Sequence, residues 1–119
     1  MNKEEFVKFV KVHIVDYNHD SLHKNLEAEL SPKASNADYI KMIELYQKMN
    51  IAEKEVVINF LKIVIDNTAS SFLSVMDGIS DVGQKGDFEL FYVEDGKSAQ
   101  LNEDKGNYLI DYYWNTDVK

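Results

Sequence analysis

The segment from Val56 to Ile65 constrains the fold more than any other part of the chain, because it is apolar nearly all round. Its many β-branched residues make a strand the competing interpretation. The pair Asn50 and Glu53 has the spacing of a capping box, and apolar residues continue to position 76. Cap and length together predict one long helix, with residues 66 to 71 as the place where it could kink or break.

A helix that is apolar on all sides belongs either in a protein core or in a membrane. Extended to position 76, this segment is long enough to span a bilayer, but Lys62 and Asp66 would then lie near the bilayer centre. Charge is costly there, so a core helix is the better interpretation. We therefore expect a central helix in which Leu61 and Val64 are almost fully buried.

Two further helices are predicted before it. The first begins with Asn2 and Glu5, another pair with capping-box spacing, and either ends at Ser31–Pro32 or is interrupted at residues 18 to 20. The second follows a cap at Ser35 or Asn36. The expected apolar stripes are Phe6, Val10, Ile14 and Tyr17 in the first helix, and Tyr39, Ile40, Ile43, Tyr46 and Met49 in the second.

After position 76 the chain changes character. A glycine-rich acidic loop leads to an aromatic strand over residues 88 to 93, and Asp95-Gly96 is a strong signal for a hairpin turn before a return strand over residues 98 to 101. Asn102 is expected to cap a last helix. The predicted fold is α+β in a single domain, residues 1–119. Three N-terminal helices occupy residues 1–76, and an acidic loop, a small antiparallel β-hairpin and a C-terminal helix occupy residues 77–119.

Composition excludes several classes of function. The 119 residues include no cysteine, which excludes disulfides, zinc ribbons, iron–sulfur clusters and thiol catalysis. All 13 basic residues are lysine, and bidentate reading of bases or phosphates relies on arginine, so nucleic acid is not an expected partner. The start of the chain does not read as a secretory signal, and we expect a cytoplasmic protein with no membrane partner.

Charge and aromatic residues are unevenly distributed. Of the net charge of -8, residues 77 to 119 carry -6, with 10 acidic residues against 4 lysines. The same segment holds 7 of the 14 aromatic residues. Tyrosine and tryptophan among acidic groups are typical of protein interfaces, although packing in the core is the competing interpretation. The expected partner-binding residues are Phe91, Asp95, Glu103, Tyr112, Tyr113 and Trp114.

Evidence for catalysis is sparse. His19 and His23 lie one helical turn apart, a spacing at which two imidazoles can share a metal ion, but a solvated polar face explains them better. The sequence contains no nucleophile-elbow or phosphate-loop motif. We therefore expect no catalytic residue, no cofactor and no metal.

A small acidic protein-binding module that covers a basic partner is the function that these features favour. In general character the chain resembles the small immunity proteins with which bacteria neutralise toxins, many of them basic nucleases. That likeness is one of type and implies no site residues. Two alternatives stay open: a structural or regulatory homo-oligomer, such as a homodimer, and a metal-dependent enzyme that uses His19 and His23.

Overall fold

The computed structural model describes residues 1–79, 83–102 and 106–115. Its elements, in chain order, are α1 (Lys3–Val10), a π-helical turn η1 (Lys11–Asp16), α2 (Tyr17–Glu27), α3 (Ala37–Gln47), α4 (Ile51–Asp77), β1 (Phe91–Glu94), β2 (Lys97–Gln100) and α5 (Leu109–Asn115). The backbone stays helical through both ends of η1, so α1, η1 and α2 form one helix. The predicted α+β fold, with three helices, a hairpin and a C-terminal helix, is confirmed.

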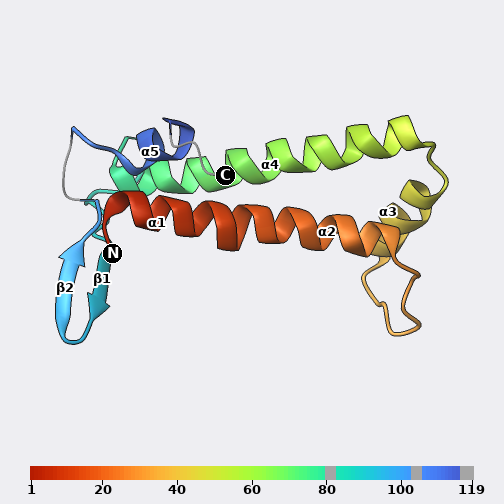
Figure 1. The fold of residues 1–119 in the computed structure, drawn as a ribbon, viewed down its shortest axis with the longest axis horizontal. Helices are drawn as coiled ribbons and strands as arrows, with labels where there is room; N and C mark the ends of the chain where they lie inside the picture. Colours follow the sequence, from red (N-terminus) through yellow and green to blue (C-terminus); the bar gives the residue numbers. More distant parts are fainter. Residues whose placement is uncertain (80–82, 103–105, 116–119) are drawn as a thin grey trace.

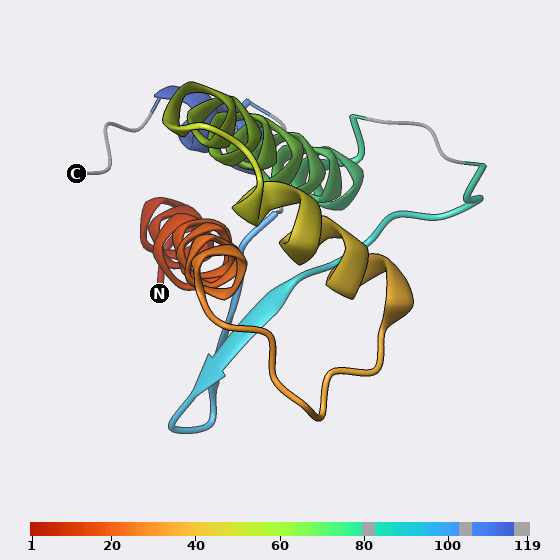
Figure 2. The same ribbon diagram turned by 90° about the vertical axis from the view of Figure 1, so that its right-hand side faces the viewer.

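Two long helices dominate the molecule. The α1–α2 helix and α4 lie side by side and antiparallel, and α3 joins them at one end (Figure 1). At the other end α5 packs on the helix pair, while the hairpin projects on the opposite side (Figures 1 and 2). α3 and α5 therefore each shield the helix pair from solvent at one end only.

Asparagine side chains begin the three N-terminal helices. The Oδ1 atom of Asn2 accepts a hydrogen bond from the backbone N–H of Glu5 at 2.8 Å, and Asn36 caps α3 in the same way at 3.0 Å. At α4 the box is reciprocal, because Glu53 also accepts from the backbone N–H of Asn50 at 3.0 Å. These side chains satisfy backbone donors that a helix start leaves unpaired. The predicted caps are therefore confirmed, and α4 runs without a break to Asp77.

The first helix ends earlier than its proline predicts. It runs through residues 18 to 20 but stops at Glu27, and Ala28 is already extended. The side-chain amide of Gln47, on α3, donates to the carbonyl oxygens of Leu26 at 3.3 Å and Ala28 at 2.7 Å. A tertiary contact thus uses backbone acceptors that a longer helix would have paired internally.

The π-helical turn changes which residues of the first helix face inward. Val7, Val10 and Val15 are buried, whereas Ile14 and Tyr17 are exposed. The predicted stripe assumed a regular 3.6-residue period. A π-helical turn adds about one residue per turn, so Val15 takes the inward position that Ile14 would have had. The prediction of Ile14 and Tyr17 as core residues is wrong for this reason.

The hairpin turn forms at Asp95 and Gly96, both with positive φ (53° and 75°), which is the geometry of a two-residue type I′ turn. The strands pair antiparallel with Phe91 opposite Gln100 and Glu94 opposite Lys97. The hairpin is confirmed, although β1 starts three residues later than predicted.

Asn102 does not cap the last helix. Its side chain accepts from the N–H of Leu90 at 2.9 Å and donates to the carbonyls of Met76 at 2.6 Å and Phe88 at 2.7 Å. The carboxylate of Asp77, at the end of α4, takes the capping role instead. It accepts from the N–H groups of Leu109 at 2.8 Å and Ile110 at 3.0 Å, so α5 starts seven residues after Asn102.

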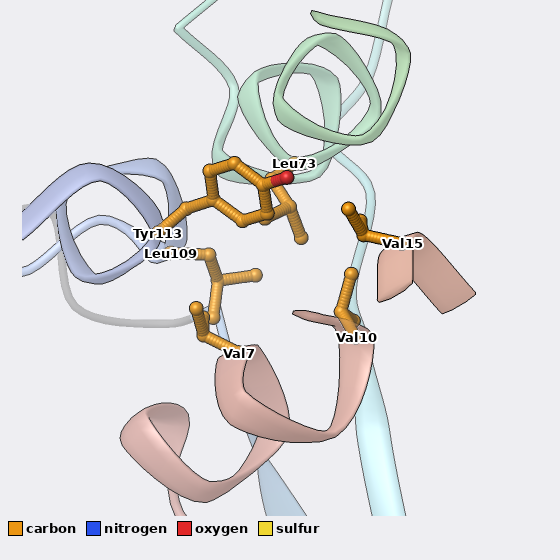
Figure 3. Close-up of a cluster of buried hydrophobic side chains, with 6 residues drawn as sticks. All are labelled: Val7, Val10, Val15, Leu73, Leu109 and Tyr113. Atoms are coloured by element: carbon orange, nitrogen blue, oxygen red, sulfur yellow. The ribbon is translucent and has the colours of Figure 1, made fainter. Parts of the chain in front are cut away.

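The core is divided between the two ends of the helix pair. One cluster, beneath α5, consists of Val7, Val10, Val15, Leu73, Leu109 and Tyr113 (Figure 3). The other, beneath α3, consists of Leu26, Ile43, Tyr46 and Ile58. Leu61 is only partly buried and Val64 is 44% exposed, so the prediction that both lie almost fully buried is wrong. Between the two clusters the helix pair forms a single layer, and no other described element covers its outer side.

Candidate binding surface

An apolar groove of about 580 Å³ runs between the two long helices. The first helix contributes one wall and α4 the other, and the lining residues are Phe6, Phe9, Val10, Ile14, Asn18, Leu22, Val64, Ile65, Thr68, Ala69 and Phe72. None of these described lining residues is charged, in a chain of which 29% of the residues are charged. The groove is therefore a predominantly apolar concave surface.

The residues of α4 extend this surface along one row. Phe60, Val64, Thr68 and Phe72 are spaced by four, so they lie one above another on the same side of the helix. Phe60 is 61% exposed and Phe72 is 58% exposed. We call the groove lining together with Phe60 the groove face.

The charges of α4 point elsewhere. Between positions 56 and 76 the sequence has only Lys62 and Asp66, and these two pair with each other at 3.6 Å. Lys62 also reaches Asp16 at 3.2 Å, and Asp66 accepts a 2.5 Å hydrogen bond from the hydroxyl of Tyr113. Both charged side chains are thus held by the first helix and α5, away from the groove face.

The accessible surface and the radius of gyration of the chain both exceed those of a compact monomer. Its accessible surface is 8651 Å², against about 6,600 Å² for a compact monomer of this mass. The radius of gyration is 18.1 Å, against about 13.5 Å for a compact domain of this length. The projecting hairpin contributes to the excess, and the uncovered helix faces contribute with it. Apolar faces of this kind mark interaction sites.

Helix α4 is long and apolar enough to cross a membrane, but length and composition are all that this observation rests on. Only 11% of its most apolar window is buried inside the molecule. The expectation that burial in the core explains the apolar character of α4 is therefore wrong. Most of that character lies on the surface.

The predicted interface residues of the hairpin are exposed. Phe91 is 49% exposed, and Asp95 is exposed at the tip of the turn. Glu103, the third predicted residue of this region, lies outside the described residues. The hairpin and α5 lie on opposite sides of the helix pair, so Phe91 and Asp95 do not share a face with the aromatic residues of α5 (Figures 1 and 2).

The predicted aromatic residues of α5 separate into core and surface. Tyr113 is fully buried and contributes to the cluster beneath α5 (Figure 3). Tyr112 is partly buried against the same cluster, and Trp114 is 56% exposed. The prediction of Tyr113 as an exposed interface anchor is wrong. Its ring is the largest fully buried side chain of the cluster between α5 and the two long helices. Trp114 remains available to a partner.

Two tyrosine hydroxyls are buried hydrogen-bond donors. Burial, with the hydrogen bond to Asp66, raises the pKa of the Tyr113 phenol. Burial and the 2.5 Å hydrogen bond to Glu27 raise the pKa of Tyr46 to about 12. Both phenols keep their protons at neutral pH and hold helices together, which is a structural role.

The two histidines of the proposed metal pair have separate partners. His19 Nε2 lies 2.8 Å from the carbonyl oxygen of Ile58 on α4, and His23 Nε2 lies 3.7 Å from a carboxylate oxygen of Glu27. No group of three or more histidine, aspartate or glutamate side chains suited to a metal ion occurs within residues 1–79, 83–102 and 106–115. The His19–His23 spacing therefore gains no further ligand from the fold.

Comparison of the chain with protein-family models, with curated proteins and with solved structures finds no match.

The groove face was not among the residues predicted to bind a partner. A usable signal was present in the sequence, since α4 is apolar on more sides than one. A chain with one layer of long helices can cover only one side of such a helix. The remaining apolar side is then left exposed by the described residues.

Proposed function

We propose that this chain is a protein-binding module and that the groove face is its main docking surface. The observation that carries the proposal is the uncharged groove between the two long helices, flanked by half-exposed phenylalanines such as Phe9 and Phe72. A groove between two helices suits an amphipathic helix, which lays its apolar side chains into the gap. Aromatic side chains near the centre of such a surface supply most of the binding energy.

The acidic end of the chain supports a second form of the same proposal, an immunity-type inhibitor that covers a basic partner such as a toxin. The specific observation is Trp114, which stands half-exposed beside the acidic Asp111. Electrostatic attraction would speed association with a basic surface, and Trp114 would anchor it. Because the hairpin lies on the other side of the molecule, this form relies on α5 without Phe91 (Figure 1).

Site-specific photo-crosslinking tests the proposal. A benzoylphenylalanine placed at position 72 puts the reactive group on the groove face. The same residue at position 91 is a matched control, since Phe91 has similar exposure on the hairpin. After irradiation in the cells that make the protein, we expect a discrete protein adduct from position 72 and none from position 91.

Absence of any protein adduct from position 72, or equal adducts from both positions, would contradict the proposal. A third probe at position 114 tests the second form. An adduct with a basic protein from position 114 alone would move the docking surface from the groove face to α5.

A further inference from the structure

Resting on the proposed function, we infer that the occupant of the groove face is a second copy of this chain, and that two copies form an antiparallel four-helix bundle. Beyond the end that α3 covers, each copy supplies one layer of two long helices. Two such layers, packed groove face to groove face about a two-fold axis, give the architecture in which four helices share one core. The molecule is 49 Å long, and α4 with its 27 residues spans about 40 Å of that length.

The area available on the groove face is sufficient for a stable dimer. Phe9, Phe60 and Phe72 are about half exposed, which leaves roughly 100 Å² of surface on each ring. With the aliphatic residues of the two walls, the apolar area is on the order of 600 Å² per copy. A standard interface buries about 800 Å² per partner, of which about 65% is apolar in homodimers. The groove face meets that requirement.

The charge distribution favours a second copy over the other candidate partners. Each chain carries -8, yet the charged residues of α4 between positions 56 and 76 are turned to the first helix and α5. Two copies can therefore meet on this face without placing like charges opposite each other. A basic protein would gain no ion pair there. An anionic membrane would repel the chain, which has no arginine and few lysines near the groove.

The polar residues of the groove also fit a protein surface. Asn18 and Thr68 lie on opposite walls among the apolar side chains. The amide of Asn18 donates to the carbonyl oxygen of Ile14 at 2.7 Å. The hydroxyl of Thr68 donates to the carbonyl oxygen of Val64 at 2.8 Å. The hydroxyl proton of Thr68 is thus satisfied within its own helix, and one of the two amide N–H donors of Asn18 is satisfied in the same way.

Sedimentation of the purified full-length chain tests the inference. We expect a species of twice 13.7 kDa at moderate concentration. Phe72→Asp should raise the dimer dissociation constant by about 30-fold or more, because it places a charge at the centre of the apolar contact. Phe91→Asp introduces the same charge at a similarly exposed site and should leave the dissociation constant within about twofold.

Salt provides a second readout. Since both copies are acidic, screening removes a repulsion, and the dimer should tighten as salt is raised. Phe9→Asp, on the opposite wall, repeats the test should Phe72→Asp fold poorly, as judged by circular dichroism.

A chain that stays monomeric at all concentrations, or a dimer that Phe72→Asp and Phe9→Asp both leave intact, would overturn the inference. If the chain is monomeric but position 72 still crosslinks a different protein, the second copy is excluded and the proposed function stands. If position 72 crosslinks nothing, both fail.

Discussion

Replacing Tyr113 by alanine should unfold the α5 end of the molecule. The side chain is fully buried between α5 and the two long helices (Figure 3), and removal of a buried aromatic ring costs about 3 to 5 kcal/mol. The lost hydrogen bond to Asp66 adds little, because Asp66 keeps Lys62 at 3.6 Å and remains partly accessible to water. We therefore expect a loss of about 4 kcal/mol, a large share of the roughly 5 to 15 kcal/mol of a domain.

The neighbouring residue is the matched control. Trp114 is 56% exposed, and its ring meets that of Tyr113 edge-on, with the ring centroids 5.0 Å apart. Trp114→Ala should cost less than about 1 kcal/mol. Tyr113→Phe, which removes only the hydroxyl, should also cost less than about 1 kcal/mol, because Asp66 keeps Lys62 and water as partners.

Urea unfolding followed by circular dichroism measures all three variants. The midpoint in a thermal scan should fall by about 10 to 20 °C for Tyr113→Ala. The reasoning is refuted if Tyr113→Ala costs below about 1 kcal/mol, or if Trp114→Ala costs as much as Tyr113→Ala. Either result would mean that α5 does not pack on the helix pair through Tyr113.

Three other expectations concern local features. Gly96→Val should destabilise the hairpin by about 1 to 2 kcal/mol, because a β-branched residue is strained at φ 75°. Faster amide hydrogen exchange in the two strands, with unchanged melting of the helices, would show this loss. Asp77→Ala removes the acceptor for the first N–H groups of α5 and should lower the free energy of unfolding by about 1 to 2 kcal/mol. An unchanged midpoint in urea unfolding would contradict this expectation. The pKa of Tyr46 rises from 10.0 to about 12 on folding, so its contribution to stability is complete below pH 10 and is lost as the pH rises through 12. Tyr46→Phe should therefore flatten the decline in unfolding free energy over that interval, and an identical pH profile would contradict it.

Elements set by local chemistry could be predicted from the sequence. The caps at Asn2, Asn36 and Asn50, the long α4 and the Asp95-Gly96 turn depend on residues close to one another in the chain, and these are present as expected. Features set by distant contacts could not. The early end of α2 depends on Gln47, and the start of α5 depends on Asp77.

The binding surface was harder to predict for a related reason. Periodicity identifies an apolar side chain but does not say whether this chain or another molecule covers it. Val64 and Phe72 have the sequence character of core residues, yet both are exposed, because among the described elements α3 and α5 each pack at one end of the helix pair. The π-helical turn added a second error, since it exchanges the positions of Ile14 and Val15 in a way that no regular period indicates.

Three matched substitutions test whether binding depends on the groove face. Phe72, Trp114 and Phe91 are each about half exposed and represent the groove face, α5 and the hairpin. Each is changed to aspartate, and affinity is measured for the protein that crosslinks to the chain, a second copy included. We expect Phe72→Asp alone to weaken binding, by about 30-fold or more. Full affinity in Phe72→Asp together with a comparable loss in Trp114→Asp would contradict it.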